Sequence, residues 1–403
     1  MSIRSDFRHT LLASYMGYIV QAVVNNFVPL LFVTFQTDYH ISLNQLSLLV
    51  FINFGVQLVV DIFAARFVDR IGYRFSVVTA HVFSAAGLLL LAILPNICAI
   101  PYVGVLIAVI VYAIGGGLLE VLISPIVEAA PTENKSAHMS LLHSFYCWGH
   151  MGVVLLSTLF FLFAGVDHWS TLAVLWALLP IANGIYFCFV PIRTLQESTH
   201  ESMPLRKLFR LSDFWVLILL MLCAGAAEQA MSQWASAFAE AGLSVSKTVG
   251  DLAGPCLFAA MMGLSRLVYS LFSKRINLRA FMLFSCGLSI SGYLLASLCK
   301  IPIIALCGCA LCGFACGIMW PGTYSIAADR CPGGGTALFA LLALAGDLGC
   351  SSGPALVGFA TGATDGRLQS GMLIALLFPL VMGIVLLLHK RRKKSTRLKM
   401  QET

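Results

Sequence analysis

Charged residues are scarce in this sequence. Only 11% of its 403 residues are Asp, Glu, Lys or Arg, whereas a soluble globular domain has about 25%. Hydrophobic residues make up 59%, and the mean hydropathy is +0.90. One water-soluble core cannot bury so much apolar surface. The composition therefore excludes an ordinary soluble domain and predicts an integral membrane protein.

The long apolar runs lack the alternation of apolar and polar residues that a transmembrane β-barrel requires. They are instead continuous for about 20 residues, the length of a helix that spans a bilayer. The polar start, "MSIRSDFRHT", is not followed by the short apolar core and small-residue cleavage site of a signal peptide. We therefore expect an all-α protein that retains its first spanning helix.

Several motifs of catalysis and ligand binding are also missing. The sequence has no "GxxxxGK[ST]" loop for ATP and no pattern typical of a nucleophile with its base. Its 13 cysteines lie almost all in apolar runs, unlike those of a disulfide framework. Cys309, Cys312 and Cys316 share a helix face, but Gly313 and Gly317 favour close helix packing over a metal site. We expect no enzyme activity, metal, cofactor or nucleic-acid partner.

Twelve apolar runs are long enough to span a membrane. They cover residues 10–34, 43–66, 75–96, 101–127, 141–164, 170–191, 213–236, 250–272, 279–299, 301–327, 336–360 and 369–389. The longest polar break, Arg193 to Asp213, divides them six and six. The predicted units are an N-terminal six-helix bundle (1–192), a cytoplasmic linker (193–212), a C-terminal six-helix bundle (213–389) and a basic cytoplasmic tail (390–403).

Lys and Arg residues are distributed unequally between the two sides of these spans. If the N-terminus is cytoplasmic, the loops of the opposite side hold only Lys247, Lys300 and Arg367. The positive-inside rule then places both termini in the cytoplasm. We interpret the tail "KRRKKSTRLK" as a topology anchor near anionic lipid, with a specific binding role as the alternative.

The second half of the chain repeats features of the first. "DRIGYR" follows the second span and "KRINLR" follows the eighth, so that Arg74 aligns with Arg279. At nearly the same offset, "HSFYCWGHMG" aligns with "GDLGCSSGP". Two pseudo-symmetric six-helix halves are typical of a transporter with a central site between them.

The segment "ARFVDRIGYR" resembles the loop signature of the major facilitator superfamily, Gly-x-x-x-Asp-Arg-x-Gly-Arg-Arg/Lys. The residues that match are Asp69, Arg70, Gly72 and Arg74. Ala65 stands in place of the first Gly, and Tyr73 in place of an Arg. With twelve spans in two halves, the resemblance covers the whole chain and implies a major facilitator fold that works by alternating access.

Three further segments resemble the fucose-permease-like branch of that superfamily, which moves sugars with protons. They are "GGGLLE" in span four, "LLHSFYCWGHMG" in span five and "GAAEQAMSQW" in span seven. The sequence departs from that branch at Gln21, Asn25 and Asn26, where an acid is common, and at Ser124-Pro125, where an Asn is usual. The resemblance implies a sugar:proton symporter of a bacterial plasma (inner) membrane.

Glu120 is the only residue with a charged side chain in the fourth span. A charge at mid-bilayer costs at least about 2.5–3.5 kcal/mol, so it needs a partner, a wet cavity or a proton. Gly116, Ser124 and Glu128 share its helix face, which predicts contact with protein or a cavity rather than lipid. We interpret Glu120 as a proton carrier. The alternative is a permanently protonated acid that hydrogen-bonds a neighbouring helix.

Glu228 in span seven and Asp347 in span eleven are the other deep acids, and both are candidates for proton coupling. Asp347 is expected to pair with Arg266 of span eight or with a histidine of span five, and a structural or gating ion pair is the alternative to coupling. The two histidines are His143 and His150.

Amide, carboxylate and aromatic side chains that suit a sugar gather in several spans. The predicted substrate contacts are Gln21, Asn25, Glu120, His143, Tyr146, Trp148, Glu228, Gln229, Gln233, Trp234 and Trp320. Helix–helix hydrogen bonding is the alternative role for the polar members, and packing is the alternative for the aromatic ones.

Charges near the cytoplasmic ends of spans two and three predict a conformational latch. The predicted gating residues are Asp69, Arg70, Gly72, Arg74 and, in span eight, Arg266. Asp61, two turns deeper, is expected to join this latch rather than the substrate site. The alternative is that these charges only set the topology.

Together these features predict a secondary active transporter that moves a small polar solute, preferably a sugar, inward with protons. Proton-driven efflux of an amphipathic drug or metabolite is one alternative, and a non-transporting membrane solute sensor is another. The expected partners are the small-molecule substrate, protons and the lipid bilayer. The expected state is a monomer.

Overall fold

The computed structural model describes residues 3–131, 135–193, 205–272, 275–331 and 335–389. Every regular element in these ranges is helical. Twelve stretches have the length and hydropathy to cross a membrane, as the continuous apolar runs require. The prediction of an all-α membrane protein with twelve spanning helices is therefore confirmed.

The first six spans contain the helices before residue 190. These are α1 (Phe7–Asn26) with the 3₁₀ turn η1 (Val28–Leu31) and α2 (Phe32–Tyr39), α3 (Leu43–Ile71), α4 (Tyr73–Ile97), α5 (Pro101–Ala129), α6 (Lys135–Ala164), and the turn η2 (Val166–His168) with α7 (Trp169–Phe189).

The short helix α8 (Leu205–Leu208) precedes the last six spans. These are α9 (Ser212–Ala237) with the π turn η3 (Phe238–Gly242), α10 (Lys247–Asp251) with the π turn η4 (Leu252–Cys256) and α11 (Leu257–Phe272), α12 (Leu278–Leu298), α13 (Pro302–Arg330), α14 (Gly335–Ala363), and α15 (Leu368–Ala375) with α16 (Leu377–Leu388).

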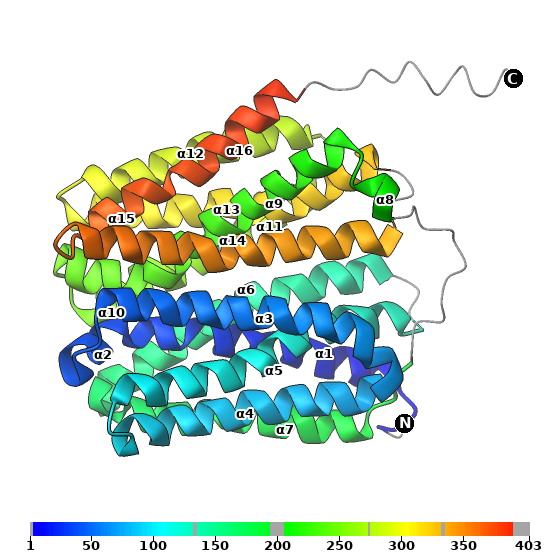
Figure 1. The fold of residues 1–403 in the computed structure, drawn as a ribbon, viewed down its shortest axis with the longest axis horizontal. Helices are drawn as coiled ribbons and strands as arrows, with labels where there is room; N and C mark the ends of the chain where they lie inside the picture. Colours follow the sequence, from blue (N-terminus) through cyan, green and yellow to red (C-terminus); the bar gives the residue numbers. More distant parts are fainter. Residues whose placement is uncertain (1–2, 132–134, 194–204, 273–274, 332–334, 390–403) are drawn as a thin grey trace, which may run out of the picture.

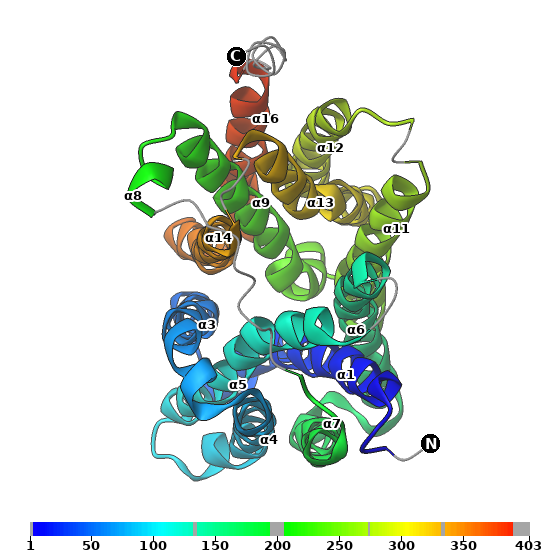
Figure 2. The same ribbon diagram turned by 90° about the vertical axis from the view of Figure 1, so that its right-hand side faces the viewer.

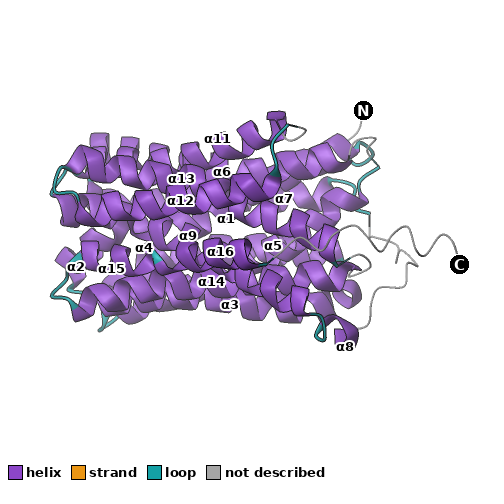
Figure 3. Ribbon diagram, turned by 90° about the horizontal axis from the view of Figure 1, so that it is seen from above, coloured by secondary structure: helices purple, strands orange, loops and turns teal. Residues whose placement is uncertain are grey.

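The helices lie side by side along one axis, and the chain begins and ends at the same end of the molecule (Figures 1 and 3). We call this end, with Phe7 and Leu388, the terminal side, and the opposite end the distal side. Seen from the terminal side, α1 and α3–α7 form one group, and α9, α11–α14 and α16 form another (Figure 2). Between the groups, α3 packs on α14 and α6 packs on α11. The residue boundaries of the two predicted bundles stay a prediction.

One arginine contact occurs in both groups. Arg74, near the start of α4, donates hydrogen bonds of 2.7–2.9 Å to three carbonyl oxygens at the end of α7. Arg279, near the start of α12, donates to the carbonyl oxygens of Leu386 and Leu387 at the end of α16. A cation is favourable there because the last carbonyls of a helix lack helical donors. The two arginines that the sequence repeat aligns therefore make the same contact.

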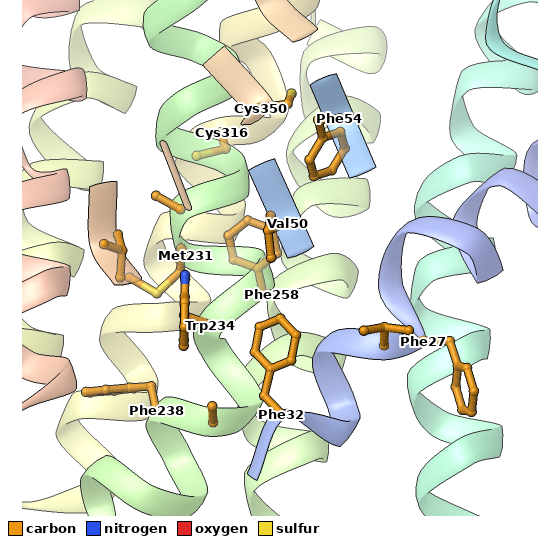
Figure 4. Close-up of a cluster of buried hydrophobic side chains, with 14 of the residues drawn as sticks. Phe27, Phe32, Val50, Phe54, Met231, Trp234, Phe238, Phe258, Cys316 and Cys350 are labelled. Atoms are coloured by element: carbon orange, nitrogen blue, oxygen red, sulfur yellow. The ribbon is translucent and has the colours of Figure 1, made fainter. Parts of the chain in front are cut away.

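Buried aromatic residues fill the distal side between the groups. The rings of Phe32 in α2 and Trp234 in α9 have centroids 5.2 Å apart, and Phe54 of α3 lies in the same cluster (Figure 4). Closer to the distal end, Gly358 of α14 lies against Ser47 of α3, where a Cβ would collide with the serine hydroxyl. Glycine therefore lets α3 and α14 approach closely on this side.

Candidate functional site

Three carboxyl groups meet where the two helix groups face each other. They belong to Asp61 of α3, Glu120 of α5 and Asp347 of α14. The carboxyls of Asp61 and Asp347 are close enough to share a hydrogen bond, and Glu120 interacts electrostatically with both. Asp347 is only 5% exposed, and the other two are partly buried. Like charges this close in a poorly hydrated site repel one another strongly when they are ionised.

This geometry corrects two expectations about the acids. Asp61 faces the other helix group and contacts Asp347, so it belongs to the central site rather than to the predicted latch. Asp347 is paired with Asp61 and not with Arg266 or a histidine of α6. The reason is the packing of α3 along α14, which the order of the spans in the sequence does not reveal.

Gln21 holds the carboxyl of Glu120. Its Nε2 donates a hydrogen bond of 2.7 Å to Glu120 Oε2 and joins α1 to α5. One turn further along each helix, the hydroxyls of Tyr18 and Ser124 lie 3.0 Å apart. On the same face of α5, Gly116 lies against Gln57 of α3. The small polar face of α5 therefore contacts protein at these residues.

Side-chain amides from three helices form one network. Asn25 Oδ1 accepts hydrogen bonds from Gln57 Nε2 at 2.8 Å and from Asn53 Nδ2 at 3.2 Å, both in α3. Gln233 Nε2 of α9 donates to the main-chain oxygen of Asn25 and to Gln229 Oε1, each at 3.1 Å. The network therefore crosses from one helix group to the other.

A pocket adjoins this network. Asn25, Asn53 and Gln233 line it together with a larger apolar surface that includes Phe32 and Tyr112. Its cavity volume is about 10 Å³, which is room for about one water molecule. Sites for drug-sized ligands enclose about 300–1,000 Å³, so in this structure the pocket places three amide side chains beside aromatic faces but has no room for a solute.

Pro29 explains how the main-chain oxygen of Asn25 becomes available to another helix. In a continuous helix this oxygen would accept from the N–H of residue 29, but proline has no N–H. The helix α1 ends at Asn26, and Pro29 lies in the 3₁₀ turn that follows. Gln233 supplies the missing donor from the opposite group.

Arg266 lies at the contact between α11 and α6. It donates to the main-chain oxygen of His143 at 3.3 Å, to Cys147 Sγ at 3.0 Å and to the main-chain oxygen of Gly317 at 3.3 Å. It also interacts electrostatically with Glu228 of α9. The guanidinium thus compensates Glu228 rather than the three clustered carboxyls. Its predicted role in gating stays a prediction.

The predicted aromatic contacts have different surroundings. On α6, Trp148 is 47% exposed, His143 is also exposed, and the Tyr146 hydroxyl accepts from an amide of α1 at 3.5 Å. Trp234 is fully buried and donates through Nε1 to a carbonyl oxygen of α14. Trp320 of α13 packs on Gly346 of α14. Of the predicted aromatic contacts, Trp148 and His143 are therefore the exposed ones, whereas Trp234 is enclosed by protein.

The predicted latch is only partly visible. The side chains of Asp69 and Arg70 lie outside the described residues. Gly72 has φ +97° between α3 and α4, a conformation that side chains with a Cβ rarely adopt. Arg74 contacts α7 of its own group, as described above. The latch role of these residues stays a prediction.

A second polar cluster lies on the distal side. Lys247 Nζ of α10 donates to the main-chain oxygen of Leu30 and lies 3.3 Å from Asp251 Oδ2 and 3.7 Å from Glu240 Oε2. Asp251 is fully buried and accepts from Thr158 Oγ1 of α6 at 3.4 Å. We call these five residues the distal clasp, because they join the two helix groups.

Sequence reasoning missed some of these residues, although signals for them exist. Asn53, Gln57 and Asp61 recur every four residues in the second span, the same periodicity that identified the face of Glu120. Lys247 and Asp251 have the same spacing at the start of the eighth span. Buried polar residues at helical spacing are therefore the common sign.

Comparisons with known proteins agree with this architecture. The family model of the Major Facilitator Superfamily matches residues 12–354 and, in a second match, residues 256–403. No curated protein matches the chain.

Solved structures share the fold at low sequence identity. A bacterial homologue of the human lysosomal transporter Spinster, in an inward-facing and occupied conformation, is 14% identical with a TM-score of 0.77, over 95% of this chain and 97% of that one. The E. coli fucose:proton symporter FucP is 16% identical with a TM-score of 0.66, over 97% and 100%. A D-xylose-proton symporter is 13% identical with a TM-score of 0.76, over 94% and 97%.

Proposed function

Because the chain belongs to the major facilitator superfamily and is a membrane transporter rather than an enzyme, we propose that it carries a small polyhydroxylated solute, a sugar, inward together with protons. The observation that carries the proposal is the contact of Gln21 with Glu120 at 2.7 Å, beside two further carboxyls and an amide network. A group that binds a proton and groups that bind hydroxyls are thus adjacent.

The amide network supports a polar cargo. Asn and Gln side chains offer both donors and acceptors, which is what the hydroxyls of a sugar need. The pocket beside the network is lined by three amide side chains and by seven residues that are apolar or aromatic. The amide network, rather than the wall of this pocket, therefore favours uptake of a polar solute over the efflux alternative.

The acid cluster supports proton coupling. Asp61, Glu120 and Asp347 repel one another when ionised, and Arg266 interacts with Glu228 instead. A proton that binds here removes charge from the membrane interior, which lowers the cost of moving the site between the two sides. Glu120 is the proposed carrier, because Gln21 joins it to α1, the helix that also holds Asn25 of the amide network. Glu228 and Asp347 assist it.

The proposed cycle is alternating access, with the distal side closed in this state. The aromatic cluster and the distal clasp close that side. Trp148 and His143, in the half of α6 nearer the terminal side, are exposed. Two of the solved structures that share the fold are those of sugar:proton symporters, and a third is that of a transporter homologue in an inward-facing conformation. The terminal side then faces the cytoplasm, as the positive-inside rule expects, in the plasma membrane and as a monomer.

The test is proton movement in liposomes that contain the purified protein. The external pH is recorded while a panel of sugars and other small solutes is added. Wild-type protein should alkalinise the medium with one sugar, and Glu120→Gln should not, although it should still exchange labelled sugar across the membrane. Asp167→Asn, which changes an exposed acid, serves as the matched control and should behave as wild type.

Two results would contradict the proposal. If no sugar or other small solute of the panel changes the external pH, and acid is released only when lipophilic cations are added, the protein would be an exporter. Solute binding without any flux would favour a sensor. An unchanged pH signal in Glu120→Gln would remove Glu120 from the coupling mechanism while leaving symport in place.

A further inference from the structure

The pair of Asp61 and Asp347 differs from the other polar contacts of the site. Its two carboxyls come from different helix groups and are close enough to share a hydrogen bond. One turn along α14, Ser351 Oγ donates to the main-chain oxygen of Phe51 in α3 at 2.9 Å, and Gly55 lies beside Ser351. The acid pair therefore lies at a close contact of α3 with α14.

Two of the four carboxyl oxygens of the pair have no donor in the described part of the chain. They are Asp61 Oδ1 and Asp347 Oδ2, which are both buried. The groups that act on the pair are Glu120 of α5, Tyr324 of α13 and Cys350 of α14, and none of these is a cation. Two carboxylates without a cation would repel, whereas one proton between them makes a strong O–H···O⁻ hydrogen bond.

We infer that Asp61 and Asp347 share one proton and form a second proton site, separate from Glu120, that joins the two helix groups. This inference rests on the proposed function and deepens it, because it assigns a proton to the contact that must change when the groups move. Loss of that proton leaves two adjacent carboxylates, which drives α3 and α14 apart. Its return restores the hydrogen bond.

Infrared spectroscopy of the full-length protein in lipid nanodiscs tests the shared proton directly. A protonated carboxyl has a C=O stretching band that disappears when it ionises. The wild type should show such a band at neutral pH and lose it on alkaline titration. Asp61→Asn and Asp347→Asn should each remove that same band, and the double variant should remove nothing further. Glu120→Gln should shift the pH at which this band disappears but should not remove the band. Asp167→Asn should leave both the band and its titration unchanged.

Proton counting gives a second readout. In a potentiometric titration, each single Asn variant should bind one proton fewer than wild type at neutral pH, and the double variant should also bind one fewer. If Asp61→Asn and Asp347→Asn removed two different bands, or if the double variant lost two protons, the two acids would be independent and the inference would be overturned. The absence of any protonated carboxyl band in wild type, or removal of the band by sodium at constant pH, would overturn it as well.

These measurements do not depend on transport. If liposomes show no solute-driven proton movement but the shared band is present, the proposed function fails and the proton pair stands. If liposomes show proton symport and the band is absent, the proposed function stands and the proton pair fails.

Discussion

A single amide group positions the proposed proton carrier. Gln21 Nε2 is the hydrogen-bond donor to Glu120 Oε2, and removal of such a donor from a buried acceptor costs about 1–3 kcal/mol. We expect Gln21→Ala to lower the free energy of unfolding by about that amount and to weaken solute-driven proton uptake.

A double-mutant cycle measures this contact. Thermal unfolding of Gln21→Ala, Glu120→Gln and the double variant should give a coupling energy of at least about 0.5 kcal/mol, because the two side chains are in contact. Additive losses would mean that Gln21 stabilises the protein through other neighbours and does not position Glu120.

The deep residues of the site were partly predictable from sequence. Glu120 and Gln21 are polar residues in apolar runs, and the cost of burying them marks them as candidates. Asp61 has the same signature, but its distance from the latch motif along the chain suggested the wrong neighbours. Which acid contacts which depends on the packing of α3 against α14, and helical periodicity contains no information about that.

The arginine contacts at helix ends lead to a prediction for whole elements. Arg74 and Arg279 each bond the last carbonyls of a neighbouring helix, and hydrogen bonds to charged groups contribute about 1.5–3 kcal/mol. We expect Arg74→Gln and Arg279→Gln to lower the thermal unfolding temperature by similar amounts. Arg367→Gln on the distal side is the control. A large effect of one arginine and none of the other would mean that the halves are not equivalent here.

The distal clasp leads to a second prediction at this scale. Lys247→Met removes the donor to Leu30 and leaves the fully buried Asp251 without its cation, a loss that costs about 3–5 kcal/mol for a buried pair. We expect faster amide hydrogen exchange in residues 28–31 and 247–256, because the closed distal side is weakened.

Lys300→Met is the matched control for the clasp, since Lys300 is an exposed lysine of the same side. Its exchange pattern should equal that of wild type. If Lys247→Met also leaves the exchange of both segments unchanged, the clasp does not hold the distal side closed.

The whole molecule was the most predictable level. A bilayer forces each span to be a continuous apolar helix, so hydropathy alone predicted twelve spans, and the superfamily expected from "DRIGYR" is confirmed by the family match. The turns η1, η3 and η4 were not predicted. The turn η1 is fully buried, and η3 and η4 are partly buried. Such local changes in helix geometry depend on tertiary contacts, and hydropathy gives no signal for them.

Topology gives a prediction at this scale. If both termini are cytoplasmic, a fluorescent protein fused after Thr403 should fold and emit in a bacterial host, while alkaline phosphatase at the same position should be inactive. Fusions within the loop after Ile97 should give the reverse. An active phosphatase at the C-terminus would show that the orientation is the reverse of the one proposed. The proposed direction of transport would then also be reversed.

Pro29 has a consequence for how natural variation in this chain should be interpreted. The bond from Gln233 ends on the backbone of Asn25, so every amino acid at position 25 retains the acceptor. A survey of tolerated substitutions at position 25 would therefore report only on the role of the Asn25 side chain. It would not detect the main-chain hydrogen bond that links the helix groups. The genetic trace of that link is expected at position 29, where any residue other than proline returns an N–H to the helix.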